Sequence, residues 1–213
     1  AMFDALWDTL YESSISAYGG DLLPDYVKDP ATGMARIQRV NQWWWTAQPG
    51  DLQPYTIYMV NHGMQIAGGV DAQNLAIIAR GQIGVGGGPS LVFDKVYIFG
   101  TGQLNFSGDI GYGDPETWCD AAVYDAYLFS TDSISLGGWG AHSWLYGLMA
   151  AAPSFAPGGA MKSAGGLYIE ADQTIQMGGN TNITGCPNPM TGHYDQVVVE
   201  QGGAAVVGGT LVQ

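Results

Sequence analysis

A repeated pattern of short β-rich runs and small turns constrains this chain more than any other feature. Each copy has three β-rich residues, a break, two apolar residues at alternate positions, and then a turn of small residues. Alternate residues lie on one face of a strand, and small residues let the backbone turn sharply. The alternating pairs are Ile83/Val85, Leu104/Phe106, Ile134/Leu136, Ile175/Met177 and Ala205/Val207.

A unit that cannot bury its apolar face alone must stack on copies of itself, which is the architecture of a β-solenoid. The five copies run over residues 76–87, 97–108, 127–138, 167–179 and 197–209. Successive turns lie about 21, 30, 41 and 30 residues apart, so loops are expected to interrupt the stack. The pattern therefore predicts a scaffold and carries no information about catalysis.

The charge balance narrows the classes of partner. The chain has 213 residues, with six Lys or Arg against 19 Asp or Glu and a formal net charge of −13. Nucleic-acid backbones and anionic membranes both favour basic surfaces, so neither is expected to be the main partner. The 33 glycines have no triplet period, which excludes collagen and suits a β fold dense in turns.

Helical patterns occur at the start of the chain and in two later segments. Apolar residues from Phe3 to Tyr18 recur at three- and four-residue spacing and end at Gly19-Gly20, which predicts an amphipathic helix lying against a sheet. A second short helix is predicted over residues 34–45, and a third over residues 144–150, which a surface loop at residues 153–159 follows. Between them, residues 56–60, 74–82 and 91–99 read as strands.

The order of these elements resembles the soluble part of a type IV minor pilin of the PilX-like kind. The resemblance is carried by the N-terminal helix and three segments: Tyr55-Thr-Ile-Tyr-Met-Val, Leu75-Ala-Ile-Ile-Ala-Arg-Gly and Lys95-Val-Tyr-Ile-Phe. It implies a mainly β protein with an N-terminal α-helix, in which a pilin-like α/β head, a helix on an antiparallel sheet, covers residues 3–99. An irregular β-solenoid with loop insertions would follow over residues 100–213.

The resemblance also implies a function. The chain would be a non-enzymatic subunit of an extracellular type IV pilus-like fibre, displayed at the cell surface for adhesion or pilus assembly. Other pilin subunits would contact it through the N-terminal helix, and a surface glycan or a protein receptor would bind its loops. It would meet a membrane only through a segment upstream of Ala1.

Two other functions fit parts of the pattern. Phage tail fibres and spikes also combine acidic, glycine-rich β-solenoids with short helices, and some cleave glycans on a solenoid face. A DNA-uptake tip protein shares the pilin fold, but it would need a local basic patch from Lys28, Arg36 and Arg39.

Acidic residues crowd one predicted loop, at Asp109, Asp114, Glu116, Asp120 and Asp125. Three hypotheses compete: a solvated acidic loop, a Ca²⁺ site at Asp109, Asp114 and Glu116, and a pair of carboxylates for glycoside hydrolysis. None matches a fixed motif. No other cofactor is expected, because His62, His142 and His193 have no metal-binding spacing.

Aromatic residues are the other candidates for binding. Trp118, Trp139, Trp144 and Tyr146 lie in predicted insertions, where exposed rings with few charges nearby suit a sugar or a protein contact. The alternative is that such rings cover the open ends of the solenoid core. The Trp43-Trp44-Trp45 run cannot all face one core, so at least one ring is expected to be partly exposed.

The two cysteines, Cys119 and Cys186, lie in predicted loops. In an exported protein they are expected to form one disulfide that constrains the insertions, and two unpaired thiols are the alternative.

Overall fold

The computed structural model describes residues 2–11, 15–86, 91–107, 110–112, 126–136, 142–157, 160–175, 182–184, 197–201, 204–208 and 210–212. Within them the protein is mainly β, with one α-helix, α1 (Met2–Tyr11), and one 3-10 turn, η1 (Asp25–Val27). The strands are β1 (Ala17–Tyr18), β2 (Ala35–Val40), β3 (Trp44–Ala47), β4 (Thr56–Val60), β5 (Gly63–Ile66), β6 (Asp71–Ala79), β7 (Ile83–Gly86), β8 (Leu91–Gly100), β9 (Leu104–Ser107), β10 (Ile110–Tyr112), β11 (Ala126–Ser130), β12 (Ser133–Leu136), β13 (His142–Pro157), β14 (Ala160–Ile175), β15 (Asn182–Thr184), β16 (Val197–Gln201), β17 (Ala204–Gly208) and β18 (Thr210–Val212).

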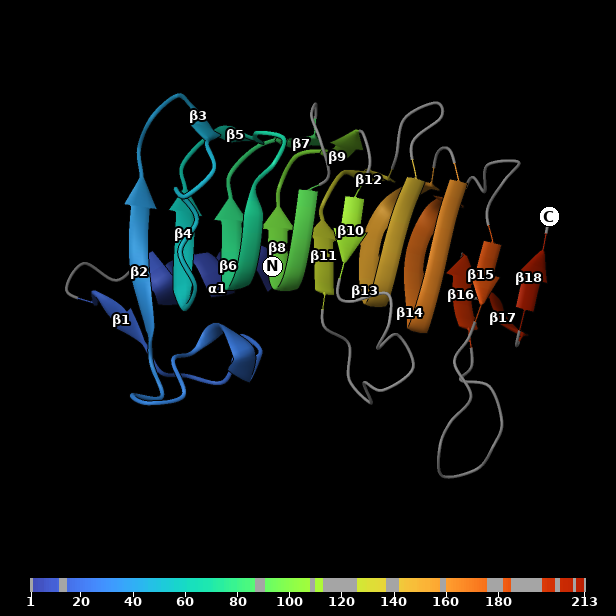
Figure 1. Cartoon of the computed structure of the whole chain (residues 1–213), viewed down its shortest axis with the longest axis horizontal. Helices are drawn as coiled ribbons and strands as arrows, with labels where there is room; N and C mark the ends of the chain where they lie inside the picture. The colour runs from blue at the N-terminus through green and yellow to red at the C-terminus, as the bar shows by residue number, and fades with distance from the viewer. Residues whose placement is uncertain are drawn as a thin grey trace.

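The strands stack as a parallel β-solenoid, seen side-on in Figure 1. Its longest ladder joins β2, β4, β6, β8, β11, β13, β14 and β16, each paired in parallel with the next. Equivalent residues form columns along the stack. One column contains Ile37, Ile57, Ala76, Tyr97, Tyr127, Met149, Tyr168 and Val198.

A second parallel ladder contains three of the five alternating apolar pairs that the sequence predicts, and Met177 of the fourth pair lies outside the described residues. It joins β3, β5, β7, β9, β12 and the C-terminal part of β13. Ile83 aligns with Leu104 and Ile134, and Val85 aligns with Phe106 and Leu136. A third ladder joins the first residues of β6, β8, β13 and β14 with β10 and β15, which adds a third β segment to the turns of the solenoid from β6 onward.

Alternation along the strands divides the apolar residues between two clusters. Inward residues of the first two ladders, such as Tyr58, Ile77, Ile98 and Leu104, fill the interior of the solenoid. Outward residues of the first ladder, such as Ile57 and Phe99, form a second cluster with the helix. Both faces of β4 are therefore buried, which explains its unbroken apolar sequence.

Helix α1 covers the outer face of the first ladder, as the amphipathic pattern predicts. Phe3, Leu6, Trp7 and Leu10 are buried there, and the Phe3 ring meets the Phe99 ring edge-on at 5.0 Å between centroids. The described helix covers Met2–Tyr11, and the predicted continuation to Tyr18 is wrong. Tyr18 lies in β1 instead, because Ala17 and Tyr18 pair antiparallel with Arg36 and Ala35 of β2.

Two predicted helices and one predicted loop are strands in the structure. Residues 34–45 form β2 and the start of β3, and residues 144–150 and 153–157 belong to β13. Strand β13 pairs with β11 and β12 on one edge and with β14 on the other. Hydrogen bonds from neighbouring turns of the solenoid therefore override local helical spacing, because propensity is weaker than such pairing.

The sheet over residues 3–99 is parallel, which corrects the predicted antiparallel sheet. The only antiparallel strand pair described there is β1 with β2. The first two repeats belong to the solenoid stack, and β8 pairs in parallel with β6 and with β11. A boundary between two units at residues 99 and 100 stays a prediction.

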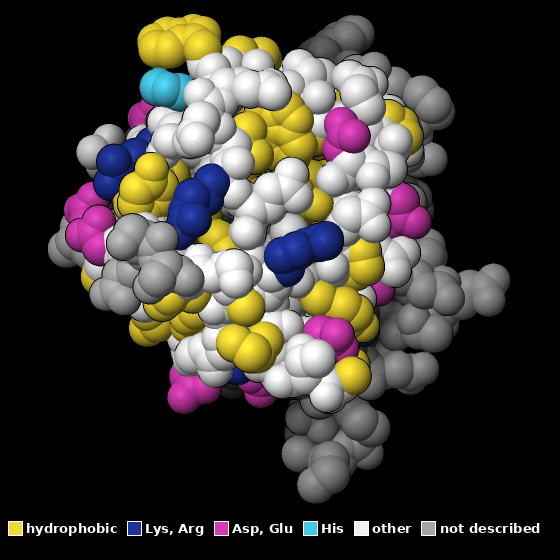
Figure 2. All heavy atoms as spheres, turned by 90° about the vertical axis from the view of Figure 1, so that its left-hand side faces the viewer, with side chains coloured by type: hydrophobic (Ala, Val, Ile, Leu, Met, Phe, Trp, Pro, Cys, Tyr) yellow, Lys and Arg dark blue, Asp and Glu magenta, His cyan; other side chains and the backbone are white. Residues whose placement is uncertain are grey.

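The last repeat also departs from the expected turn of a solenoid. Strand β17, with Ala205 and Val207, folds back antiparallel on β16, and β18 pairs antiparallel with β15. Gly202 and Gly203 separate β16 from β17, and a two-glycine connection favours a hairpin over a new turn of the solenoid. The opposite end of the stack faces the viewer in Figure 2, where hydrophobic and basic side chains lie next to each other.

Gly86 holds a tight corner at the end of β7, and we predict that Gly86→Ala destabilises the protein. Its φ is +124°, and a Cβ there would lie 1.4 Å from the carbonyl oxygen of Ser107. For alanine, the positive φ alone costs about 1–2 kcal/mol, and the clash with the Ser107 backbone adds to this cost. Urea unfolding should give a loss of about 2 kcal/mol or more. Gly19→Ala, where the nearest atoms lie 3.6 Å away, is the matched control and should leave stability nearly unchanged.

The burial of Tyr97 predicts that the protein loses stability at alkaline pH. Its ring is 6% exposed, and burial raises the pKa of its hydroxyl above the ordinary value. The unfolded chain loses this proton near pH 10, so the stabilisation is complete below that pH and is lost as pH rises through the higher folded pKa. Tyr97→Phe should therefore flatten the fall in unfolding free energy above pH 10. Identical alkaline profiles for the two proteins would contradict this assignment.

Candidate functional site

Three residues with positive φ line up at one corner of the solenoid. Tyr55, Asn74 and Lys95 have φ of 56°, 52° and 55°, and each stands immediately before the residues that align in the longest ladder. The Tyr55 N–H donates to the Asn74 carbonyl at 2.7 Å, which joins two successive turns. Non-glycine residues rarely adopt this conformation, and asparagine tolerates it best of the three. The corner therefore projects three large side chains outward in a column.

The segment from Pro24 to Met34 lies over this corner. Val27 of η1 is fully buried and anchors it in the outer apolar cluster. The Asp29 carboxylate accepts a hydrogen bond from the Ala31 N–H at 2.8 Å, and the Asp29 carbonyl accepts one from the Gly33 N–H at 2.7 Å. Gly33, at φ +68°, allows the return toward β2. This turn is thereby held in one position above the column.

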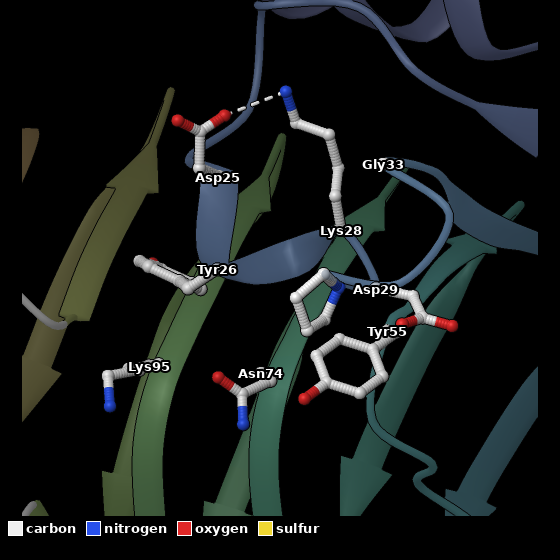
Figure 3. A pocket seen from close by; sticks show the side chains of 9 residues that line it. Asp25, Tyr26, Lys28, Asp29, Gly33, Tyr55, Asn74 and Lys95 are labelled. Atoms are coloured by element: carbon white, nitrogen blue, oxygen red, sulfur yellow. Dashed lines mark ion pairs between the residues drawn. The ribbon is translucent and has the colours of Figure 1, made fainter.

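A cleft of about 510 Å³ separates the segment from the corner. Figure 3 shows Tyr55, Asn74 and Lys95 side by side on neighbouring strands, with Tyr26 and Asp29 above them. The full lining is Asp25, Tyr26, Lys28, Asp29, Pro30, Gly33, Tyr55, Asn74 and Lys95. A second hollow, of about 490 Å³, lies beside it and shares Asp29 and Tyr55 with it. Together they form an open surface site on both sides of the Tyr55 ring.

One lysine of the cleft, Lys28, forms ion pairs with carboxylates of the protein. Lys28 lies 2.8 Å from the Asp25 carboxylate and 3.8 Å from that of Asp21, and its side chain is only 11% exposed. The hydrogen bond with Asp25 raises the pKa of Lys28, so it stays charged at every pH below its ordinary value. Figure 3 shows its amine pointing away from Asn74 and Lys95. Lys28 therefore holds the segment in place, and Lys95 is the lysine that lies at the corner.

The lining combines phenol rings, an amide, carboxylates and an amine at an open site. An amide N–H can donate a hydrogen bond to a ligand hydroxyl group, and amide and carboxylate oxygens can accept one from a neighbouring hydroxyl group. Tyrosine rings offer flat apolar faces. The three corner residues follow the stack, whose strands are about 4.8 Å apart. Such an array suits an elongated ligand with many hydroxyl groups.

Most residues that the sequence singled out cannot be compared with this site. Asp109, Asp114, Glu116, Asp120, Asp125, Trp118, Trp139, Cys119, Cys186 and His193 lie outside the described residues. Trp144, Tyr146 and His142 lie in the first part of β13, where only the backbone is described. In the described part of the chain no group of three or more His, Cys, Asp or Glu residues could hold a metal ion.

The aromatic run and the basic residues are described. Trp43 is 80% exposed and Trp44 47%, which confirms that the run does not face one core. Lys28, Arg36 and Arg39 have separate partners. Lys28 pairs with Asp25, an Arg36 nitrogen donates to the Thr56 hydroxyl at 3.1 Å, and the Arg39 guanidinium lies 5.3 Å from the centre of the Tyr11 ring.

Sequence reasoning missed the corner column, although a signal exists. Asn74 and Lys95 each follow a polar residue and precede a run of apolar residues, in Gln73-Asn74-Leu75 and Asp94-Lys95-Val96. A polar pair at the same place in successive repeats marks a bend between two strands. The overlying segment gives no such signal, because its place depends on contacts distant in sequence.

No α-helix in the described residues is long and apolar enough to cross a membrane. The chain matches no family model, no curated protein and no solved structure.

Proposed function

We propose that the protein is a non-enzymatic subunit of an extracellular type IV pilus-like fibre, of the minor pilin kind, that serves in adhesion or pilus assembly. The observation that supports this most is the position of α1. One face of the helix is buried on the outside of the sheet, while Met2 is 61% and Tyr11 43% exposed. A helix held on the flank of a β scaffold is what a fibre subunit needs to join a fibre core.

The contacts of α1 are specific enough to fix its direction. Phe3 packs on Phe99, and the Arg80 guanidinium lies 4.5 Å from the centre of the Trp7 ring. The Arg39 guanidinium lies 5.3 Å from the centre of the Tyr11 ring at the other end of the helix. Cation–π contacts of this kind add about 0.5–1 kcal/mol each at exposed sites. In the proposal, other pilin subunits contact this helix and its continuation.

The proposed subunit differs from the expected pilin in one respect. The helix lies on a parallel solenoid flank, where the resemblance implies an antiparallel sheet. The solenoid itself would then serve as the head, and its corners and loops would meet a receptor.

The gene upstream of Ala1 tests the proposal. A fibre subunit of this kind requires a short basic leader, a processing site with an early glutamate, and about 20 apolar residues that lead into α1. Peptides of this chain should also appear, cross-linked to pilin, in fibres sheared from the cell surface. A different upstream sequence, together with absence from sheared fibres, would rule the proposal out.

In the same proposal, the corner cleft binds a surface glycan. Asn74→Gly removes the amide and keeps a residue that accepts positive φ, so the fold should survive. Loss of one or two hydrogen bonds should weaken binding about tenfold. Affinity is measured on a panel of neutral and uronate-containing oligosaccharides. The matched control is Gln73→Ala, an exposed neighbour that does not line the cleft and should bind like wild type. Equal binding by Asn74→Gly would exclude the cleft.

A phage tail fibre or spike is the second candidate, and one observation favours it. The described sheet is a parallel β-solenoid from β2 onward, where a minor pilin would have an antiparallel sheet, and β-solenoids occur in such fibres and spikes. A spike should form a stable trimer, so the mass of the protein in solution separates the two candidates.

A further inference from the structure

The N-terminal end of the second ladder is an open edge. Strand β3 pairs with β5 on one side, and no described strand pairs with its other side. Solenoids normally cover such ends, because an unpaired strand is a template for another chain. At the other end of the stack, β17 and β18 fold back over the last turn.

The backbone of β3 has hydrogen-bonding groups that face away from the solenoid. In a parallel pair, alternate residues direct both of their groups to the same neighbour. The Ala47 carbonyl accepts from the Ala67 N–H at 2.9 Å, so Trp45 and Ala47 face the next turn of the solenoid. Trp44 and Thr46 therefore direct their N–H and carbonyl groups outward. Both residues are exposed.

The side chains around this edge do not protect it. Natural edge strands usually carry lysine, proline or an inward charge that blocks pairing. No charged residue lies between Arg39 and Asp51, and β3 itself reads Trp-Trp-Thr-Ala. The Trp44 ring lies against Gly63 of the next turn, where an added Cβ would come within 2.5 Å of it. The edge is thus flat, uncharged and aromatic.

The first inward layer of the solenoid is partly exposed at the same end. Val40, Ala47 and Leu52 are buried in this layer. Trp45 is the first residue of an inward column, and its ring stacks on Tyr58 at 5.5 Å between centroids. Gln38, in the ladder column of Tyr58, is exposed, so part of the layer is open to solvent.

We infer that this edge binds a second copy of the chain, with the two β3 strands antiparallel across a two-fold axis near Trp45. Residues in a hydrogen-bonded antiparallel pair exchange both of their hydrogen bonds. Trp44 of each copy would then stand opposite Thr46 of the other, which uses all the outward groups of both residues. The two open ends would cover each other, with the Trp45 rings on the same side of the joined sheet.

The charges of the chain favour this edge over the rest of the surface. No charged residue lies between Arg39 and Asp51. The Arg39 guanidinium lies over the Tyr11 ring, and the Asp51 carboxylate accepts a hydrogen bond from the Gln48 N–H at 2.8 Å, so both flanking charges are held by contacts within their own copy. The net charge of −13 opposes association through charged surfaces, so the uncharged run is the surface on which two copies can meet.

The mass of the protein in solution, measured by light scattering and sedimentation at micromolar concentrations, tests the inference. Wild type should be a dimer. Thr46→Pro removes one outward N–H without removing a bond to β5, so it should give a monomer with unchanged circular dichroism. Its melting temperature should no longer rise with protein concentration, because dimerisation stabilises only the wild type. Thr46→Val keeps the N–H and should remain a dimer. A monomeric or trimeric wild type, or a dimeric folded Thr46→Pro variant, would overturn the inference.

The test of the dimer does not depend on a fibre function, since upstream sequence and sheared fibres test that separately.

Discussion

The register between successive turns of the solenoid determines the rest of this structure. Each turn hydrogen-bonds to the next through parallel ladders, and equivalent residues align in columns from β2 to β16. A slip of one residue would exchange the inward and outward faces and place Ile57 and Phe99 inside the core. The outer apolar surface, the seat of α1 and the corner column all exist because this register is fixed.

The same register explains which parts of the fold the sequence predicts. Ile83/Val85, Leu104/Phe106 and Ile134/Leu136 alternate strictly, and they align in one ladder. The predicted helix over residues 34–45 is wrong. Its apolar residues have the three- and four-residue spacing of a helix, but they also fit the alternation of two short strands, β2 and β3. Val40 and Ala47 are buried there by contacts with β4 and β5, which no local pattern records. The parallel direction of the strands was missed for the same reason, since local spacing does not specify strand direction.

The candidate site depends even more on contacts distant in sequence. Tyr55, Asn74 and Lys95 are 19 and 21 residues apart in the chain, and the ladder register brings them together. The segment above them is held by Val27, whose burial requires Leu23, Ala35 and the outer apolar cluster. The sequence contains a signal for a bend at Asn74 in β6, but it contains none for the cleft around this residue. A surface site on a solenoid forms only when successive repeats stack, because no single repeat contains all the residues that line it.

The two ends of the stack meet one constraint in different ways. The first and last turns of a solenoid leave backbone groups without a partner in the stack. At the C-terminal end, β17 and β18 reverse direction and pair antiparallel with β16 and β15, which places a reversed strand at each edge. At the N-terminal end, β1 covers only the first residues of β2, and β3 remains exposed beside Trp43 and Trp44. Large aromatic side chains at an unpaired edge are costly to leave in water, and they are also the residues that contribute most to interfaces. The exposed aromatic residues at this unpaired edge therefore support the inference that the N-terminal end meets a second copy of the chain.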